Sequence, residues 1–204
     1  MSTLRHKHLY MFHKFWDVNG DGVLTWEDFR LLAEKYAKIQ RRGKLEKDVF
    51  ERWQSILEKW WNELTSYADY NKDTIVEFDE WLRFFDELGK ATKCFKDLPD
   101  FLQLYLHLFF LVMDSNKDGL FCVKDYKKYL TNQNMDVNRA QECFQFMLND
   151  EDRSNGNAMT SDRFKDLVYE YWVSSDANSQ GKYICGPFDS AVMDELEKMV
   201  KKRQ

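Results

Sequence analysis

Residues 17–28 read DVNGDGVLTWED, and the same pattern returns as DYNKDTIVEFDE at residues 69–80 and as DSNKDGLFCVKD at residues 114–125. In each segment acidic or amide side chains stand at the first, third and fifth positions, and an acidic residue stands at the twelfth. One copy of such a pattern is moderate evidence, whereas three copies in one chain indicate an internal repeat. This repeat guides the interpretation of the rest of the sequence.

The pattern matches the twelve-residue EF-hand loop, which surrounds a calcium ion with oxygen ligands. Calcium takes roughly six to eight oxygens, from side chains at positions one, three, five and twelve, a backbone carbonyl at position seven, and position nine, often through water. The sequence therefore predicts three calcium sites. Their expected ligands are Asp17, Asn19, Asp21, Val23, Thr25 and Asp28; Asp69, Asn71, Asp73, Ile75, Glu77 and Glu80; and Asp114, Asn116, Asp118, Leu120, Cys122 and Asp125.

The three loops differ at two positions that affect metal binding. Only the second loop ends in a glutamate, Glu80, which can chelate calcium through both oxygens. Asp28 and Asp125 are one methylene shorter, so loops 17–28 and 114–125 are expected to accept magnesium as well as calcium. The second loop carries Thr74 where a glycine usually makes the sharp turn, at a cost of about 1–3 kcal/mol. Its intact ligand set favours a working site, and a decayed site is the alternative.

A fourth helix-loop-helix unit is expected because EF-hands bury their inner faces by pairing. Apolar residues at helical spacing flank a segment at about residues 149–162. With Gly156 as the sixth residue, this loop would begin at Glu151 and place Arg153 at a ligand position. We therefore expect a hand that has lost metal binding. The apolar eighth residues of the other loops, Leu24, Val76 and Phe121, are expected in short strands that link paired loops.

These units predict an all-α fold of four EF-hands in two pairs, forming one compact globule. The expected organisation is an N-terminal pair at residues 1–92, a C-terminal pair at residues 93–188, and an extra helix at residues 189–204. That last segment has one narrow apolar face, which we expect to pack back onto the globule. The cluster of His6, Lys7 and His8 is expected at a solvated end.

Composition excludes several other classes of protein. The chain has 204 residues and a net charge of −5, which disfavours nucleic-acid binding. Its longest apolar run, residues 101–113, is too short to cross a bilayer, so no stable membrane insertion is expected. We find no signal-peptide pattern at the start and no catalytic arrangement, and predict a cytoplasmic, monomeric protein that is not an enzyme.

The four cysteines are scattered along the chain and are expected to be free thiols. Cys122 stands at the ninth position of its loop, which faces solvent in this motif. The other three lie on or near apolar helical patterns, so they are expected to be buried. Cys122 should therefore be the most reactive thiol.

With these residues identified, the chain resembles the sarcoplasmic calcium-binding proteins, and among them the calexcitin group most closely. The resemblance covers about residues 5–188 and rests on the three loops at these intervals, the damaged fourth, and the segment EYWVSSD at residues 170–176, followed by GKYICG at 181–186. It implies a compact all-α globule and a cytosolic calcium buffer or sensor. The calexcitin group similarly lacks the glycine of the second loop. Nothing carries over to residues 189–204.

Two alternatives remain open at this point. The calcium-triggered photoproteins share this fold, and the many aromatic residues here could line a cavity for a luciferin-type small molecule, although such residues more often fill a core. A regulatory subunit that binds a partner helix is the other alternative, and a sensor would likewise need a protein target. The sequence does not separate a buffer from a sensor.

Overall fold

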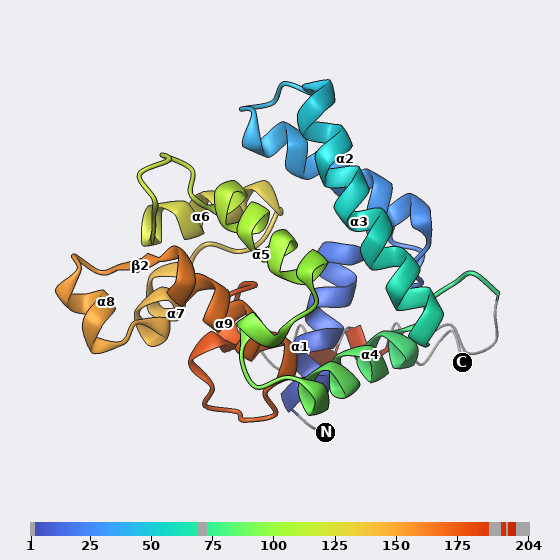
Figure 1. Ribbon diagram of the computed structural model, residues 1–204. Helices are drawn as coiled ribbons and strands as arrows, with labels where there is room; N and C mark the ends of the chain where they lie inside the picture. Colours follow the sequence, from blue (N-terminus) through green and yellow to red (C-terminus); the bar gives the residue numbers. More distant parts are fainter. Residues whose placement is uncertain (1–2, 69–72, 188–192, 195, 199–204) are drawn as a thin grey trace.

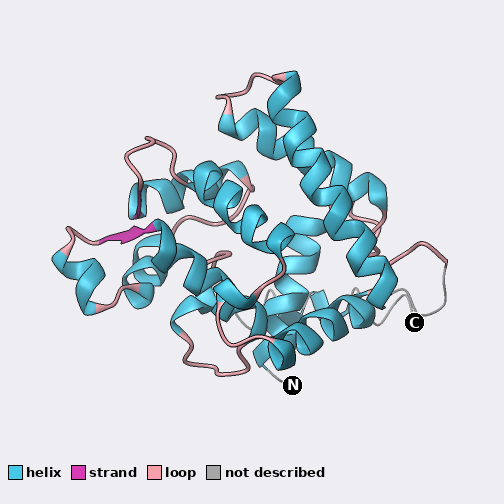
Figure 2. Ribbon diagram, in the orientation of Figure 1, coloured by secondary structure: helices cyan, strands magenta, loops and turns pink. Residues whose placement is uncertain are grey.

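A computed structural model of the chain describes residues 3–68, 73–187, 193–194 and 196–198. Helices dominate this part of the chain, and strands are limited to two short segments (Figures 1 and 2). The predicted all-α class is confirmed. In chain order the elements are α1 (Thr3–Met11), α2 (Trp26–Gln40), α3 (Lys47–Ala68), α4 (Phe78–Ala91), α5 (Asp100–Met113), β1 (Leu120–Cys122), α6 (Val123–Asn132), α7 (Ala140–Met147), α8 (Asp150–Ser154), β2 (Ala158–Thr160) and α9 (Ser161–Val173), with a π-helical turn η1 (Phe12–Trp16) and 3-10 turns η2 (Phe95–Asp97) and η3 (Gln180–Tyr183).

Each predicted loop lies between two helical elements. Loop one joins η1 to α2, loop two joins α3 to α4, and loop three joins α5 to α6. After α7 the chain passes through the short helix α8 and strand β2 before it enters α9. This last stretch lies where the apolar pattern predicts a fourth helix-loop-helix unit.

Short antiparallel contacts join the loops in pairs, as predicted for their eighth residues. Leu24 and Val76 form a β-bridge in which each backbone N–H donates to the other carbonyl at 2.9 Å. Strands β1 and β2 pair in antiparallel register, with Phe121 opposite Met159. These contacts place loop one beside loop two, and loop three beside the fourth loop.

An aromatic core joins the two halves of the molecule. The Trp60 ring of α3 lies 4.6 Å from Trp16, 4.7 Å from Tyr105 of α5 and 5.6 Å from Trp172 of α9, measured between ring centroids. All four side chains are buried. Aromatic rings bury large apolar areas and contribute additional energy through edge-to-face contacts. Because helices from both halves share this cluster, neither half has a separate core.

The N-terminal helix differs from expectation, because Lys7 and His8 are fully buried. His8 Nε2 lies 2.7 Å from the carbonyl of Trp172, and its Nδ1 accepts the indole N–H of Trp81 at 3.2 Å. Burial lowers the pKa of His8 to about 3, so the ring is neutral at pH 7. The expected solvated end is therefore wrong for these two residues: they tie α1 to α4 and α9.

The predicted helix at residues 189–204 lies largely outside the described residues. Within the described part of this segment, residues 193–194 and 196–198 are helical, and Met193 and Leu196 are buried in the core. Glu197 lies 3.7 Å from Arg5 of α1. This part of the segment thus packs against the globule. Among the described residues, no helix is long and apolar enough to span a membrane.

Candidate metal-binding loops

Loop one, residues 17–28, begins where the π-helical turn η1 ends. The carboxylate of Asp17 is buried, and its Oδ2 atom accepts the N–H of Gly22 at 2.9 Å and faces His13 Nδ1 at 3.3 Å. Its Oδ1 atom is buried without a hydrogen-bond partner among the described residues. Because an unsatisfied buried oxygen is costly, a cation beside Asp17 would complete its coordination. The donor chemistry at the start of the loop therefore fits a metal ion.

Short-range hydrogen bonds hold the middle of loop one in a tight curve. The N–H of Asp21 donates to Asn19 Oδ1 at 2.9 Å, and the Asn19 amide donates to Asp21 Oδ2 at 2.9 Å. The N–H of Val23 donates to Asp21 Oδ1 at 3.1 Å. Gly22 adopts a φ of +85°, which glycine tolerates because it lacks a Cβ atom. These contacts fix the backbone that carries the first, third and fifth side chains.

Asp28, at the twelfth position, joins the start of loop one to its end. Its Oδ2 atom accepts the N–H and hydroxyl of Thr25 at 2.9 and 3.1 Å, and its Oδ1 atom accepts the N–H groups of Val18 and Asn19 at 3.1 and 3.3 Å. Burial raises the pKa of Asp28 despite these bonds. The same carboxylate caps the first turn of α2, so one side chain serves both the helix and the loop.

Loop three repeats this arrangement with different neighbouring residues. Asp114 Oδ2 accepts the N–H of Gly119 at 2.9 Å, and Gly119 has a φ of +83°. Asp125 Oδ2 accepts the N–H of Cys122 at 3.0 Å, and its Oδ1 accepts the N–H and hydroxyl of Ser115 at 3.1 and 2.7 Å. Burial acts to raise the pKa of Asp125, but the hydrogen bonds from Cys122 and Ser115 together hold it below its usual value. Asn116 donates to Asp118 Oδ2 at 2.6 Å, as Asn19 does to Asp21.

Only the second part of loop two is described, because Asp69 and Asn71 lie outside the described residues. The N–H of Ile75 donates to Asp73 Oδ1 at 2.9 Å, and the N–H of Glu77 donates to Glu80 Oε2 at 3.0 Å. The positive φ predicted for position six is confirmed: Thr74 has a φ of +63°. From Asp73 onward, this loop therefore repeats the bonds of loops one and three despite a strained threonine.

The fourth loop has a different register from the one predicted. Since Phe121 is the eighth residue of loop three, its partner Met159 is the eighth residue here, and the loop runs over residues 152–163. Asn157, with a φ of +61°, takes the sixth position that the sequence pattern gave to Gly156. Asp152 is then the first residue, and Arg163 stands at the twelfth, where the other loops carry a carboxylate. The sequence interpretation missed this arginine.

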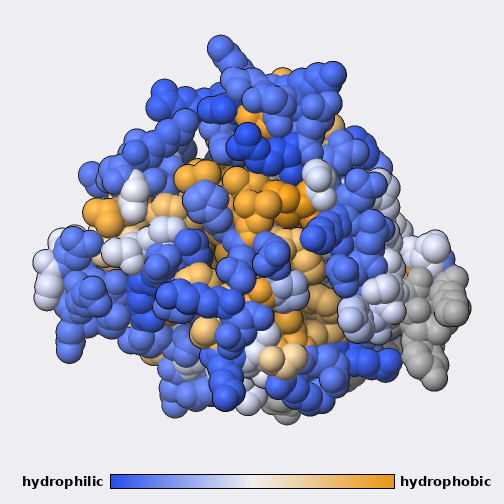
Figure 3. Space-filling model, viewed as in Figure 1, coloured by the Kyte–Doolittle hydropathy of each residue, from blue (hydrophilic) through white to orange (hydrophobic). Residues whose placement is uncertain are grey.

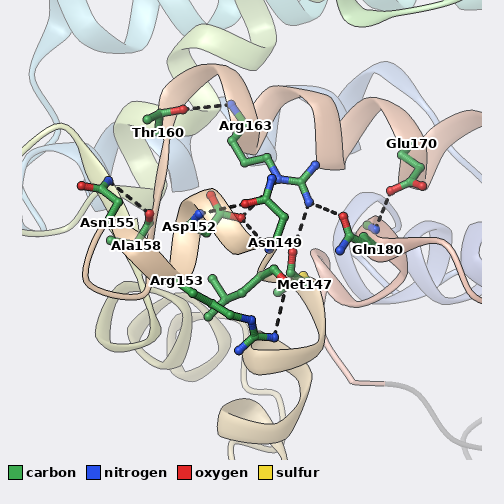
Figure 4. A network of polar contacts seen from close by, with 12 residues as sticks. Met147, Asn149, Asp152, Arg153, Asn155, Ala158, Thr160, Arg163, Glu170 and Gln180 are labelled. Carbon is green, nitrogen blue, oxygen red and sulfur yellow. Dashed lines mark hydrogen bonds and ion pairs between the residues drawn. The ribbon is translucent and has the colours of Figure 1, made fainter.

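Arg163 lies at the centre of a polar network in the fourth loop (Figure 4). Its Nε atom lies 3.3 Å from Asp152 Oδ2, and a terminal nitrogen donates to the carbonyl of Met147 at 3.2 Å and to Gln180 Oε1 at 2.5 Å. The side chains of Arg163 and Asp152 are 20% and 5% exposed. The arginine thus connects α9 with α7, α8 and η3.

Among residues 3–68, 73–187, 193–194 and 196–198, no group of three or more His, Cys, Asp or Glu side chains lies close enough together to hold a metal ion. The carboxylates instead accept hydrogen bonds from the loops that carry them. The predicted ligand sets also draw on asparagine side chains and backbone carbonyls, so a cluster of acidic residues alone would not complete them. The ligand roles therefore remain predictions.

The aromatic core leaves little room for a small molecule. The void lined by Phe15, Trp16, Tyr105, Trp172 and neighbouring residues has a volume of about 10 Å³. Ligand pockets typically measure about 300–1,000 Å³, whereas about 10–15 Å³ holds one water molecule. Among the described residues, the aromatic side chains around this void therefore fill a core and enclose no cavity of luciferin size.

Curated relatives agree with the predicted resemblance. The chain is 27% identical over 177 residues to sarcoplasmic calcium-binding proteins I, III and IV of Branchiostoma lanceolatum, an alignment that covers 86% of this chain and 92% of the relative. It is 22% identical over 181 residues to calexcitin-1 of Caenorhabditis elegans, covering 88% and 84% of the two chains. No family model matches the chain. The resemblance to sarcoplasmic calcium-binding proteins is thereby confirmed.

Solved structures agree on the fold. A sarcoplasmic calcium-binding protein from amphioxus superposes with a TM-score of 0.75 at 23% identity, covering 92% of this chain and 98% of that one. Calcium-loaded apo-aequorin from Aequorea victoria gives a TM-score of 0.58 at 18% identity, covering 84% and 90%. The described chain therefore has the fold that these two kinds of protein share.

Proposed function

We propose that this chain binds calcium at three sites, formed by residues 17–28, 69–80 and 114–125. The observation that carries the proposal is the matched hydrogen bonding of loops one and three. In both loops, backbone N–H groups donate to a buried aspartate at position one and to an aspartate at position twelve. The partnerless Asp17 Oδ1 atom of the described chain supports a cation there. The names of the curated relatives support calcium as that cation.

In this proposal each loop supplies oxygens from positions one, three, five, seven, nine and twelve. Loop two binds calcium through both oxygens of Glu80, whereas the shorter Asp28 and Asp125 bind through fewer oxygens and allow magnesium to compete. Thr25 and Cys122 stand at the ninth position, where a water molecule bridges to the ion. The residues of the fourth loop bind no calcium.

We further propose that the protein acts as a cytoplasmic calcium buffer without catalytic activity. The apolar helix faces of both halves are used in one shared core, which leaves little apolar surface for calcium to release. All four cysteines are free, as expected in a reducing compartment. Titration by calorimetry, with a magnesium-saturated sample as a control, tests the number and selectivity of the sites.

One feature favours a calcium sensor as the second candidate. A groove of about 480 Å³ lies between the end of α2 and loop three, with Ile39 and Leu111 among its apolar residues and Asp114 and Asp125 beside them. Figure 3 shows apolar side chains gathered at the centre of this face. Fluorescence of a hydrophobic dye during calcium titration separates the two functions: a rise supports the sensor, whereas no change or a decrease supports the buffer.

A further inference from the structure

We propose that the Arg163 guanidinium is the permanent cation of the fourth loop, and that it holds strand β2 in the position that loop three needs for binding calcium. The first part stands on the fourth loop alone. The second part rests on the proposed function, because it assumes a calcium site in loop three.

The register of the loop places the arginine where a metal ligand belongs. Thr160 caps α9 three residues before Arg163, just as Cys122 caps α6 three residues before Asp125. In loop three the twelfth side chain accepts the N–H of the ninth residue. The capping box of loop three also has the opposite bond, from the N–H of the twelfth residue to the ninth side chain. The fourth loop keeps only this second bond, in which the Thr160 hydroxyl accepts the N–H of Arg163 at 3.2 Å. The helix cap is therefore preserved without a carboxylate, which leaves the twelfth side chain available for another role.

That side chain reaches the carboxylate at position one, which would otherwise bind the ion. Asp152 is buried, and its Oδ2 atom accepts the N–H of Asn149 at 3.0 Å as well as the Arg163 Nε–H at 3.3 Å. In a calcium-binding loop, the ion joins positions one and twelve by coordinating both. Here Arg163 makes the same connection directly, because its positive charge and N–H donors satisfy the carboxylate.

The arginine also neutralises the end of a neighbouring helix. It donates to the carbonyl of Met147, the last residue of α7, where the helix dipole favours positive charge. Arg153 donates to the carbonyls of Gln145 and Leu148 at 3.0 and 3.4 Å, but no contact between Arg153 and Asp152 is present among the described interactions. The two arginines thus share the task of capping α7, whereas only Arg163 pairs with position one.

A covalently attached cation has consequences that a calcium ion does not have. Arginine keeps its charge at all physiological pH values and cannot dissociate when calcium falls. The fourth hand therefore keeps one geometry at every calcium concentration. Through the pairs Phe121–Met159 and Cys122–Ala158, this fixed hand supports β1 and the seventh to ninth positions of loop three. Less reordering is then needed when loop three binds its ion.

Arg163→Gln removes the charge and shortens the side chain while keeping a polar amide, and Arg153→Gln makes the same change on the same loop as the matched control. In chelator, Arg163→Gln is expected to lower the melting temperature by about 5–10 °C, because it leaves Asp152 buried without its cation. In calcium, it is expected to weaken the third site about tenfold, while loops one and two keep their affinities. Arg153→Gln should change each quantity by less than about a third of that amount.

Site-resolved titration distinguishes the possible outcomes. Asp118→Asn, which weakens the third site, is made in the wild-type and Arg163→Gln proteins so that the signal of that site can be identified by difference. In a separate experiment, adding Asp152→Asn to Arg163→Gln should recover part of the lost stability. An unchanged melting temperature in chelator would overturn the role of Arg163 as a cation. Unchanged affinity at the third site would overturn the support that Arg163 gives to loop three.

Wild-type protein that binds no calcium at loop three would instead contradict the proposed function and leave the chelator result valid. If Arg163→Gln does not fold, hydrogen exchange of wild-type residues 150–163 with and without chelator replaces it, and protection lost with the metal would contradict the proposal.

Discussion

The third and fourth loops lie side by side and have the same strand-to-helix second half, yet they end in opposite charges. Their first halves differ, because residues 150–154 form the short helix α8. Both contribute one strand to the β1–β2 ribbon, and both continue into a helix capped by the ninth residue. Phe121 of the third loop packs against Phe164 of α9 with ring centroids 5.1 Å apart. The twelfth residue is Asp125 in one loop and Arg163 in the other.

Under the proposed function, this difference separates the shape of a hand from its capacity for metal. Strand pairing and aromatic packing hold both loops in related conformations. The charge at position twelve then decides whether the loop needs an external cation, as proposed for loop three, or carries its own. A single inversion of charge can therefore leave a hand folded and insensitive to calcium.

The largest expected difference between the two loops comes from matched removal of their buried carboxylates. Asp125→Asn should weaken calcium binding at the third site about 100-fold, because it removes a charged ligand that also fixes Ser115 and Cys122. Asp152→Asn should leave the number of bound ions unchanged and lower the melting temperature. Calorimetric titration of both variants checks this pair. Loss of a calcium ion from Asp152→Asn would contradict the assignment of the fourth loop.

Metal removal should affect the two loops unequally. In chelator, backbone amides of residues 115–120 are expected to exchange with deuterium at least about tenfold faster, because the bonds to Asp114 are then the main restraint on that loop. Residues 150–157 should change by less than about threefold. Hydrogen exchange measured by mass spectrometry with and without calcium gives both numbers. Equal acceleration in the two segments would argue against a permanent cation.

The length of the twelfth side chain should set the selectivity of loops one and three. Asp125→Glu is expected to raise the preference for calcium over magnesium about fivefold, because the longer side chain can place a second oxygen on the larger ion. Asp28→Glu should act in the same direction in loop one. Competition titrations with both metals provide the ratio, and an unchanged ratio in both variants would refute this dependence on side-chain length.

The smallest expected difference between the two loops concerns position nine, which is Cys122 in loop three and Thr160 in the fourth loop. Calcium should change the labelling rate of the Cys122 thiol only slightly. Cys94 and Cys122 are both partly exposed, so the expected burial of Cys94 is wrong. Burial and the nearby Asp125 raise the pKa of Cys122, which slows its reaction. We expect calcium to slow labelling of Cys122 about threefold further and to leave Cys94 unaffected. A Cys122 rate independent of calcium would contradict its place beside the third site.

The sequence predicted the local features of this molecule well. The positive φ of Thr74 and the pairing of Leu24 with Val76 follow from position in a twelve-residue loop, and both are present. The register of the fourth loop was missed because Gly156 suggested a sixth position. Asparagine also tolerates a left-handed backbone, and Asn157 takes that place. Strand pairing with β1, a contact between distant residues, was needed to reveal it.

Long-range burial was the other feature that the local pattern did not predict. Lys7 and His8 lie in a charged segment that appears suited to solvent. Their environment comes from α9, more than 160 residues away, where Tyr171 donates to the carbonyl of Lys7 at 2.6 Å and Trp172 contacts His8. The carboxylates of loops one and three needed no such contact, because their hydrogen bonds come from the loop itself and its flanking turn.

A count of the calcium ions bound per chain tests most directly whether three loops bind calcium and the fourth does not. Native mass spectrometry, supported by equilibrium dialysis at saturating calcium, measures this number on the unmodified protein. We expect three bound ions. Four ions would show that the fourth loop binds calcium in spite of Arg163, and fewer than three would show that at least one of the loops at residues 17–28, 69–80 or 114–125 is not a site.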